Sequence, residues 1–109
     1  MRRPLRFLAH KLDLDEKQVA ELARIINDLK TERAQAEVDR RRTVTALADA
    51  VASDEYQEQH TVHAGSLRVQ SAERLQQAIA NALKQIHGVL DTEQRARFAY
   101  LIRSGTLSL

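Results

Sequence analysis

The chain has 109 residues, with 29% charged and 43% hydrophobic residues, one proline, three glycines and no cysteine. This length favours one domain, and the lack of cysteine excludes disulfides, thiol catalysis and cysteine metal sites. The 17 basic and 15 acidic residues leave a net charge of +2, too small a bias to indicate nucleic-acid binding.

The first half of the chain predicts a short helix followed by a long one. After Pro4, three leucines share one helical face and predict a short helix over about 4–12: Leu5, Leu8 and Leu12. Apolar residues three and four apart then predict a long helix over about 16–52. This stripe starts with Val19, Leu22, Ile26 and Leu29, thins between Thr31 and Arg42, and resumes at Val44, Leu47 and Val51.

The second half repeats this order in reverse. A second long helix is expected over about 55–88, and a last short helix over about 92–103. The stripe of the second long helix consists of Leu67, Leu75, Ile79, Ala82, Leu83, Ile86 and Val89. The composition and this pattern predict a single all-α domain, 1–109, in which two short helices flank an extended hairpin of two long helices.

Helix length has a consequence for assembly. A helix of about 37 residues is roughly 55 Å long, whereas a compact domain of this size has a radius of gyration of about 13 Å. A hairpin of two such helices leaves one side of its apolar stripe uncovered. We therefore expect a homodimer, most simply with twofold symmetry.

A five-residue pattern, Leu-Asp-x-x-Gln, occurs near both ends of the chain, at 14–18 and 90–94. Its leucine, aspartate and glutamine positions are Leu14, Asp15 and Gln18, and Leu90, Asp91 and Gln94. In each copy the aspartate can accept from free N–H groups of the first helical turn, while the glutamine reaches back to the N–H of the aspartate. This is a capping box, so both copies predict helix starts.

With this layout, the two copies resemble the motif of the LTxxQ-motif family, although Asp15 and Asp91 stand where that family usually has threonine. The family includes the Spy/CpxP-type periplasmic chaperones and the related heavy-metal-responsive proteins of the ZraP and CnrX type. The resemblance implies a cradle-like antiparallel homodimer that binds unfolded or misfolded proteins without ATP. It also implies a periplasmic location.

The start of the chain bears on that location. The residues MRRPLRFLAHKLDLD contain basic side chains but no apolar core of the kind found in signal peptides. As written, the chain would stay in the cytoplasm, whereas a truncated chain would have lost its export signal. No stretch approaches the roughly 20 apolar residues of a membrane span, so we expect no transmembrane segment.

Four arginines in the middle of the first long helix form a candidate client-binding surface: Arg33, Arg40, Arg41 and Arg42. Shallow apolar patches rimmed by cations suit flexible chains, and arginine stems can cover apolar groups while their charged ends stay in water. The alternative is a solvated face with i,i+4 pairs such as Glu37 with Arg41.

His60 and His63 are three residues apart, so they could share one helical face as metal ligands do. Metal-responsive relatives bind ions through histidine, and the resemblance therefore implies a candidate zinc, nickel or cobalt site. The alternative is a pair of ordinary surface histidines. No other cofactor is expected.

The favoured function is an ATP-independent, chaperone-like or stress-response module of the Spy/CpxP type that binds proteins as a dimer. One alternative is a heavy-metal-responsive sensor or metal-binding regulator, and another is a structural module that pairs with a partner chain. The sequence contains no Gly-rich phosphate loop and no nucleophile with a paired base, so we expect no enzyme.

Overall fold

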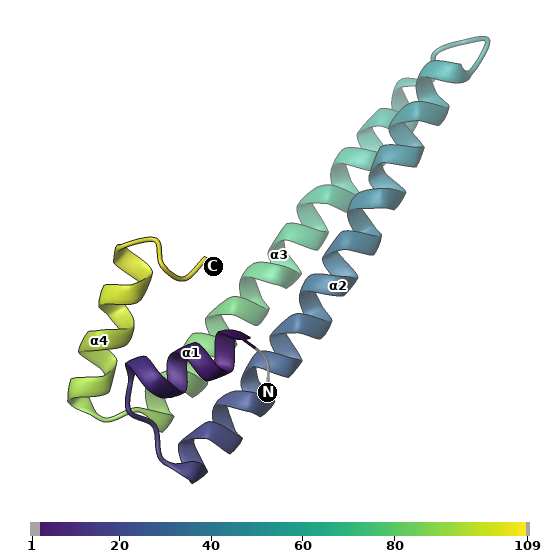
Figure 1. Ribbon diagram of the computed structural model, residues 1–109. Coiled ribbons are helices and arrows are strands. Elements are labelled where there is room, and N and C mark those ends of the chain that lie inside the picture. Colours follow the sequence, from purple (N-terminus) through teal and green to yellow (C-terminus); the bar gives the residue numbers. More distant parts are fainter. Residues whose placement is uncertain (1–2, 109) are drawn as a thin grey trace. The chain divides into compact units, whose positions relative to one another are not determined.

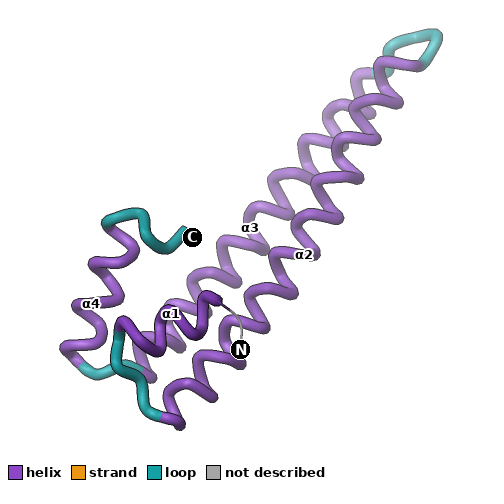
Figure 2. Tube along the Cα trace, viewed as in Figure 1, coloured by secondary structure: helices purple, strands orange, loops and turns teal. Residues whose placement is uncertain are grey.

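The computed structural model describes residues 3–108. These residues form four helices and no strand: α1 (Arg3–Lys11), α2 (Glu16–Ala52), α3 (Glu58–Val89) and α4 (Thr92–Arg103) (Figures 1 and 2). The all-α prediction, with two long helices between two short ones, is confirmed. None of these helices is both long and apolar enough to cross a membrane.

The contacts divide the chain into two compact units. Unit 1 comprises Met1–Leu29 and Ile79–Leu109, so it contains α1, the start of α2, the end of α3 and α4. Unit 2 comprises Lys30–Ala78, which form a helical hairpin from the rest of α2 and α3 and the loop 53–57 between them. Each long helix therefore contributes to both units.

Unit 1 holds the large apolar side chains. The predicted faces of α1 and of the first part of α2 are buried together, with Leu12 and Leu22 fully enclosed. The end of α3 and α4 complete this core with Ala82, Ile86 and Leu101. Burial of a leucine or isoleucine side chain stabilises a fold by about 1.5–3 kcal/mol, so this cluster is the main apolar contribution to unit 1.

The end of α1 turns sharply at Asp13, whose φ of 52° lies in the left-handed region. The N–H of Leu14 donates to the carbonyl of Ala9 at 3.0 Å, and the N–H of Asp13 donates to His10 at 3.4 Å. This is a Schellman arrangement, in which aspartate is one of the few residues other than glycine that tolerate the left-handed position. The turn leaves the carbonyls of Leu12 and Asp13 at the end of α1.

Unit 2 buries small and polar side chains instead. Ala50 and Ala64 are enclosed between α2 and α3, and Thr43 and Asp39 are buried with them. The predicted continuation of the α2 stripe is wrong in part, because Val44 and Val51 are exposed. Residues 39, 43 and 50 follow helical spacing on a neighbouring face of α2, and that face packs against α3.

Candidate functional site

The two Leu-Asp-x-x-Gln copies form the capping boxes expected of them. Asp15 accepts from the N–H of Gln18 at 2.8 Å, and Gln18 accepts from the N–H of Asp15 at 3.1 Å. Asp91 and Gln94 repeat this exchange at 2.9 and 3.0 Å at the start of α4. The predicted caps of α2 and α4 are thereby confirmed.

Unit 1 also brings the two glutamines into direct contact. Gln18 Nε2 donates to Gln94 Oε1 at 2.7 Å, and Gln94 Nε2 donates to Gln18 Oε1 at 3.1 Å. The remaining amide hydrogens reach carbonyls at helix ends: Gln18 donates to Val89 at 3.1 Å, and Gln94 donates to Leu12 at 3.1 Å. The glutamine pair, Gln18 and Gln94, therefore connects the ends of α1 and α3 to the starts of α2 and α4.

The chemistry of this pair explains why the pattern requires glutamine. Each amide offers two hydrogens and two acceptor positions, and all four are used at both residues. Glutamate could not donate to the carbonyls, and a shorter side chain would not reach them. The motif is thus a structural element of unit 1, and it carries no reactive group.

The four candidate arginines lie along α2 in unit 2, but they do not form one face. Successive residues of an α-helix are about 100° apart, so Arg40, Arg41 and Arg42 point in three directions. Arg40 makes two hydrogen bonds to Glu37, at 2.8 and 3.0 Å, and Arg41 lies 3.5 Å from the same carboxylate. Hydrogen bonding to Arg40 lowers the pKa of Glu37 and raises that of Arg40.

The other two arginines are available to a ligand. Among residues 3–108, neither Arg33 nor Arg42 has a hydrogen-bond or ion-pair partner. Arg42 and Arg41 border a shallow hollow of about 450 Å³ on the surface of α2. Its lining residues are Val38, Arg41, Arg42, Thr45, Ala46 and Asp49. This α2 hollow combines the apolar groups of Val38 and Ala46 with two guanidinium groups and one carboxylate, that of Asp49.

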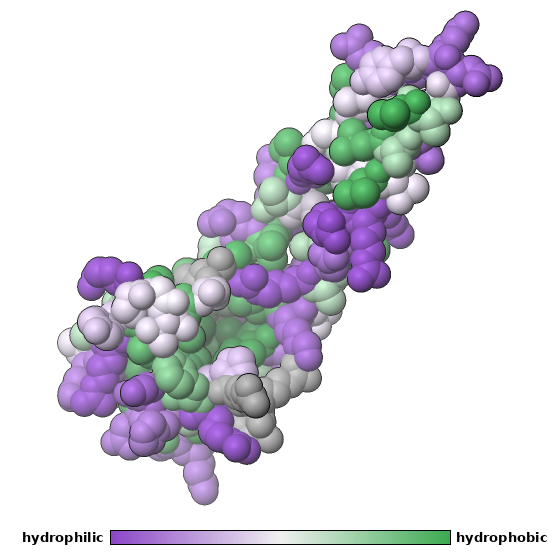
Figure 3. Space-filling view, turned by 45° about the horizontal axis from the view of Figure 1, so that its top comes forward, coloured by the Kyte–Doolittle hydropathy of each residue, from purple (hydrophilic) through white to green (hydrophobic). Residues whose placement is uncertain are grey.

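On the face drawn in Figure 3, apolar side chains in green lie between polar ones in purple along the hairpin of unit 2. Five valines of unit 2 are exposed: Val38, Val44, Val51, Val62 and Val69. Val51 retains 79% of its accessible surface. Single exposed apolar residues are ordinary. Val44 and Val51 are seven residues apart and share one face of α2, and Val62 and Val69 likewise share one face of α3.

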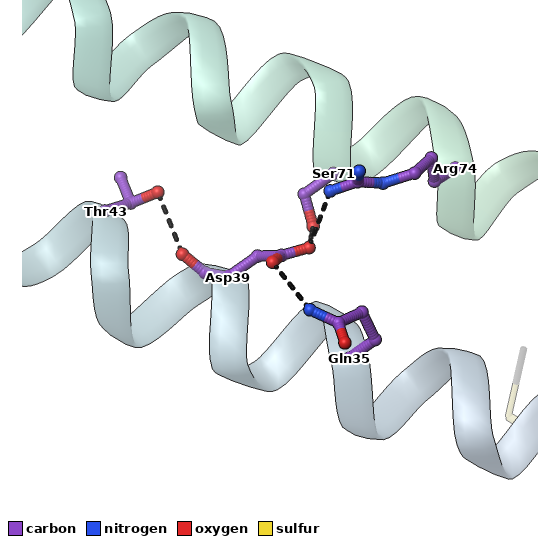
Figure 4. Close-up of polar contacts among 5 residues, drawn as sticks. All are labelled: Gln35, Asp39, Thr43, Ser71 and Arg74. Carbon is purple, nitrogen blue, oxygen red and sulfur yellow. Dashed lines mark hydrogen bonds and ion pairs between the residues drawn. The ribbon is translucent and has the colours of Figure 1, made fainter.

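A buried carboxylate joins the two helices of unit 2. Asp39 accepts from the Ser71 hydroxyl at 2.8 Å, from the Gln35 amide at 3.0 Å and from Arg74 at 3.0 Å (Figure 4). The hydrogen bonds from Ser71 and Gln35, assisted by the positive charge of Arg74, hold the pKa of Asp39 below its ordinary value of 3.8, against the opposing effect of burial. Thr43 adds a bond to the backbone carbonyl of Asp39 at 3.1 Å.

This Asp39 cluster was not predicted from the sequence. A signal was present, because residues 36, 39, 43 and 50 keep helical spacing with small or polar side chains. The aspartate stood among many charges that could equally face water, and its partners Ser71 and Arg74 are more than thirty positions further along the chain.

His60 and His63 both lie exposed in the first turns of α3. In the part of the chain that the structure describes, no group of three or more His, Asp or Glu side chains could hold a metal ion. A third ligand for these two histidines would have to come from outside this set of residues.

Comparison with known proteins agrees with the motif. The model of the LTXXQ motif family matches residues 1–101, which is most of the chain. No curated protein and no solved structure matched the chain. The paired capping boxes, their four-helix layout and this match lead to one conclusion: the chain belongs to the LTXXQ motif family.

Proposed function

We propose that this protein is an ATP-independent, chaperone-like module of the Spy/CpxP type, which binds unfolded or misfolded proteins in a periplasmic stress response. The observation that carries this proposal is the α2 hollow, in which apolar groups lie beside Arg41 and the unpaired Arg42. A flexible client chain can bury apolar side chains on such a surface and place its own acidic residues beside the arginines. This binding does not require one fixed geometry.

An aggregation assay tests this function. The wild-type protein is expected to delay light scattering by a chemically denatured client at equimolar ratio, without ATP. In the variant Arg41→Glu/Arg42→Glu, the concentration for half-maximal protection should rise roughly fivefold, because each exposed charge contributes up to about 1 kcal/mol. Figure 3 shows the apolar surface of this hairpin, which the variant leaves in place.

The matched control is Arg6→Glu/Lys84→Glu, which changes the net charge equally within unit 1. Both residues are exposed, and neither has a hydrogen-bond or ion-pair partner among residues 3–108. This control should protect the client as the wild type does. Absence of protection by the wild type, or an equal loss in both variants, would contradict the proposed function.

The proposed dimer has its own measurement. Light scattering should report about twice the chain mass of 12.4 kDa, because Val44 and Val51 of α2 are exposed and a second copy could cover them. The mass should not change on addition of zinc, since His60 and His63 lack a third ligand among the described residues. A mass or melting temperature that responds to zinc would favour the metal-responsive alternative, and a monomer would contradict the dimer.

A further inference from the structure

One face of α3 in unit 2 is exposed along its length and has not been assigned a role. It consists of positions spaced by three, four and seven residues, which share one side of a helix: Glu58, Val62, Gly65, Ser66, Val69 and Glu73. We call this set the α3 outer stripe. Val62 and Val69 keep 64% and 58% of their accessible surface.

The α3 outer stripe points away from α2. Ala64, two positions after Val62 and about 200° away around the helix, is fully buried between the helices. Ser71, two positions after Val69, donates to Asp39 of α2. At Gly65, the position that a Cβ atom would occupy has no neighbouring atom within 4 Å. Another backbone can therefore approach this part of α3 closely.

The charges on the α3 outer stripe have one sign. Glu58 and Glu73 stand at its two ends, about 22 Å apart along the helix axis, and neither has an ion-pair partner among the described residues. The nearest basic residue is Arg68, which is exposed but lies about 100° around the helix from Val69. Arg74 points toward α2, where it contacts Asp39.

These charges decide against a second copy of the chain as the occupant. The centre of the stripe lies between Gly65 and Ser66, so antiparallel pairing of two stripes would place Glu58 opposite Glu73 at both ends. Parallel pairing would place each glutamate opposite its own copy. Both arrangements bring like charges together, which is unfavourable at an interface.

We infer that the α3 outer stripe is a docking site for an amphipathic helix of another protein. The partner helix has a small or aliphatic face that packs on Val62, Gly65 and Val69, as helices do in apolar grooves. It carries a lysine or arginine near each end of that face, about four turns apart, opposite Glu58 and Glu73. This site is distinct from the α2 hollow, because the arginines of the hollow attract acidic residues, whereas the glutamates of the stripe attract basic ones.

Peptide binding followed by fluorescence anisotropy tests this site. The probe is a labelled helical peptide with an alanine–leucine face and two lysines about 15 residues apart, and a second peptide has glutamates in their place. The wild-type protein should bind the lysine peptide at least tenfold more tightly than the glutamate peptide. Glu58→Lys/Glu73→Lys should invert this preference, whereas Glu32→Lys/Asp54→Lys, with the same change in net charge, should preserve it.

Gly65→Leu provides a variant that does not depend on charge. A Cβ atom at the exposed Gly65 meets no neighbouring atom within 4 Å, so a leucine side chain can extend into open space, and leucine favours a helix more than glycine does. The melting temperature should therefore not fall, while the affinity for the lysine peptide should drop at least tenfold. Equal binding of both peptides, binding unchanged by Gly65→Leu, or a dimer that Gly65→Leu dissociates would each overturn the inference.

Because this assay does not use an aggregating client, its result is independent of the proposed chaperone activity.

Discussion

Replacement of Gln94 by alanine is expected to lower the free energy of unfolding of unit 1 by about 3 kcal/mol. Gln94 retains only 7% of its accessible surface. Its removal deprives the N–H of Asp91 and the carbonyl of Leu12 of their partners and leaves Gln18 with half its hydrogen bonds. Buried polar groups without partners cost more than the lost bonds alone.

Tyrosine fluorescence can follow this effect with a probe that lies in unit 1. The chain has two tyrosines and no tryptophan, and Tyr100 lies in α4 of unit 1 whereas Tyr56 lies in unit 2. Urea unfolding in a Tyr56→Phe background therefore reports on unit 1. Gln85→Ala, at an exposed glutamine of α3 in unit 1 that accepts a surface hydrogen bond from Arg24, is the control and should change the free energy of unfolding by less than about 0.5 kcal/mol.

A double-mutant cycle then tests the contact between the glutamines. Gln18→Ala alone should cost about 2 kcal/mol, since Gln18 is only half buried. The double variant should cost about 1 kcal/mol less than the sum, because the bonds between the two amides are lost only once. Gln94→Glu should be at least as destabilising as Gln94→Ala, since a carboxylate cannot donate to Leu12. If the losses in the free energy of unfolding of the two single variants added up to the loss in the double variant, the two capping boxes would act independently.

Asp39→Asn is expected to have the largest effect in unit 2. Three donors converge on the carboxylate, from Ser71, Gln35 and Arg74, and an asparagine presents one NH₂ group where an acceptor is needed. The melting temperature of unit 2 should fall by roughly 5–10 °C. The fluorescence of Tyr56 in a Tyr100→Phe background follows this unit.

Two further variants distinguish the loss of the Asp39 hydrogen bonds from a general loss of negative charge. Glu37→Gln removes an exposed carboxylate of unit 2 that lies 2.8 Å from Arg40, and it should leave the melting temperature almost unchanged. Asp39→Ala/Ser71→Ala removes the carboxylate together with its half-buried serine donor. It should recover most of the loss, because the two remaining donors, Gln35 and Arg74, are exposed and can bond to water. If Asp39→Asn melted like the wild type, the cluster would have no stabilising role.

The pH dependence of Asp39 has a defined sign. Because its pKa in the folded state is lowered from 3.8 by hydrogen bonds from Ser71 and Gln35 and by Arg74, folding favours the carboxylate form. Its stabilising effect should be complete above about pH 5 and disappear as the pH falls through the folded-state pKa. The difference in melting temperature between wild type and Asp39→Asn should therefore narrow between about pH 5 and pH 2. A difference that widened on acidification would contradict the assigned protonation state.

The local elements followed from the sequence with little help from tertiary contacts. Helix starts at Glu16 and Thr92 are encoded by the two capping boxes, which involve residues only three positions apart. The apolar spacing of α1, of the first part of α2 and of the end of α3 predicted their buried faces, because large side chains leave few alternatives. The motif itself also indicated the family.

Unit 2 shows why periodicity alone was insufficient. Val44 and Val51 define an apolar face of α2, but the structure places Thr43, Ala50 and Asp39 against α3. Small and polar side chains give a weak pattern. The face of Thr43 and Ala50 is offset by only one position in sequence from the face of Val44 and Val51. Contacts with α3 decide between them.

The sequence by itself determined the helices, the buried face of unit 1 and the family, since these depend on residues close together in the chain. Only the tertiary structure decided that Gln18 and Gln94 share one set of hydrogen bonds, that Asp39 is enclosed by donors from two helices, and that Val62 and Val69 stay exposed. Each of these features depends on groups 30–80 positions apart or on the absence of a neighbour. Local propensity and spacing contain no information about such distances, whereas packing brings the groups together and selects which polar atoms find partners.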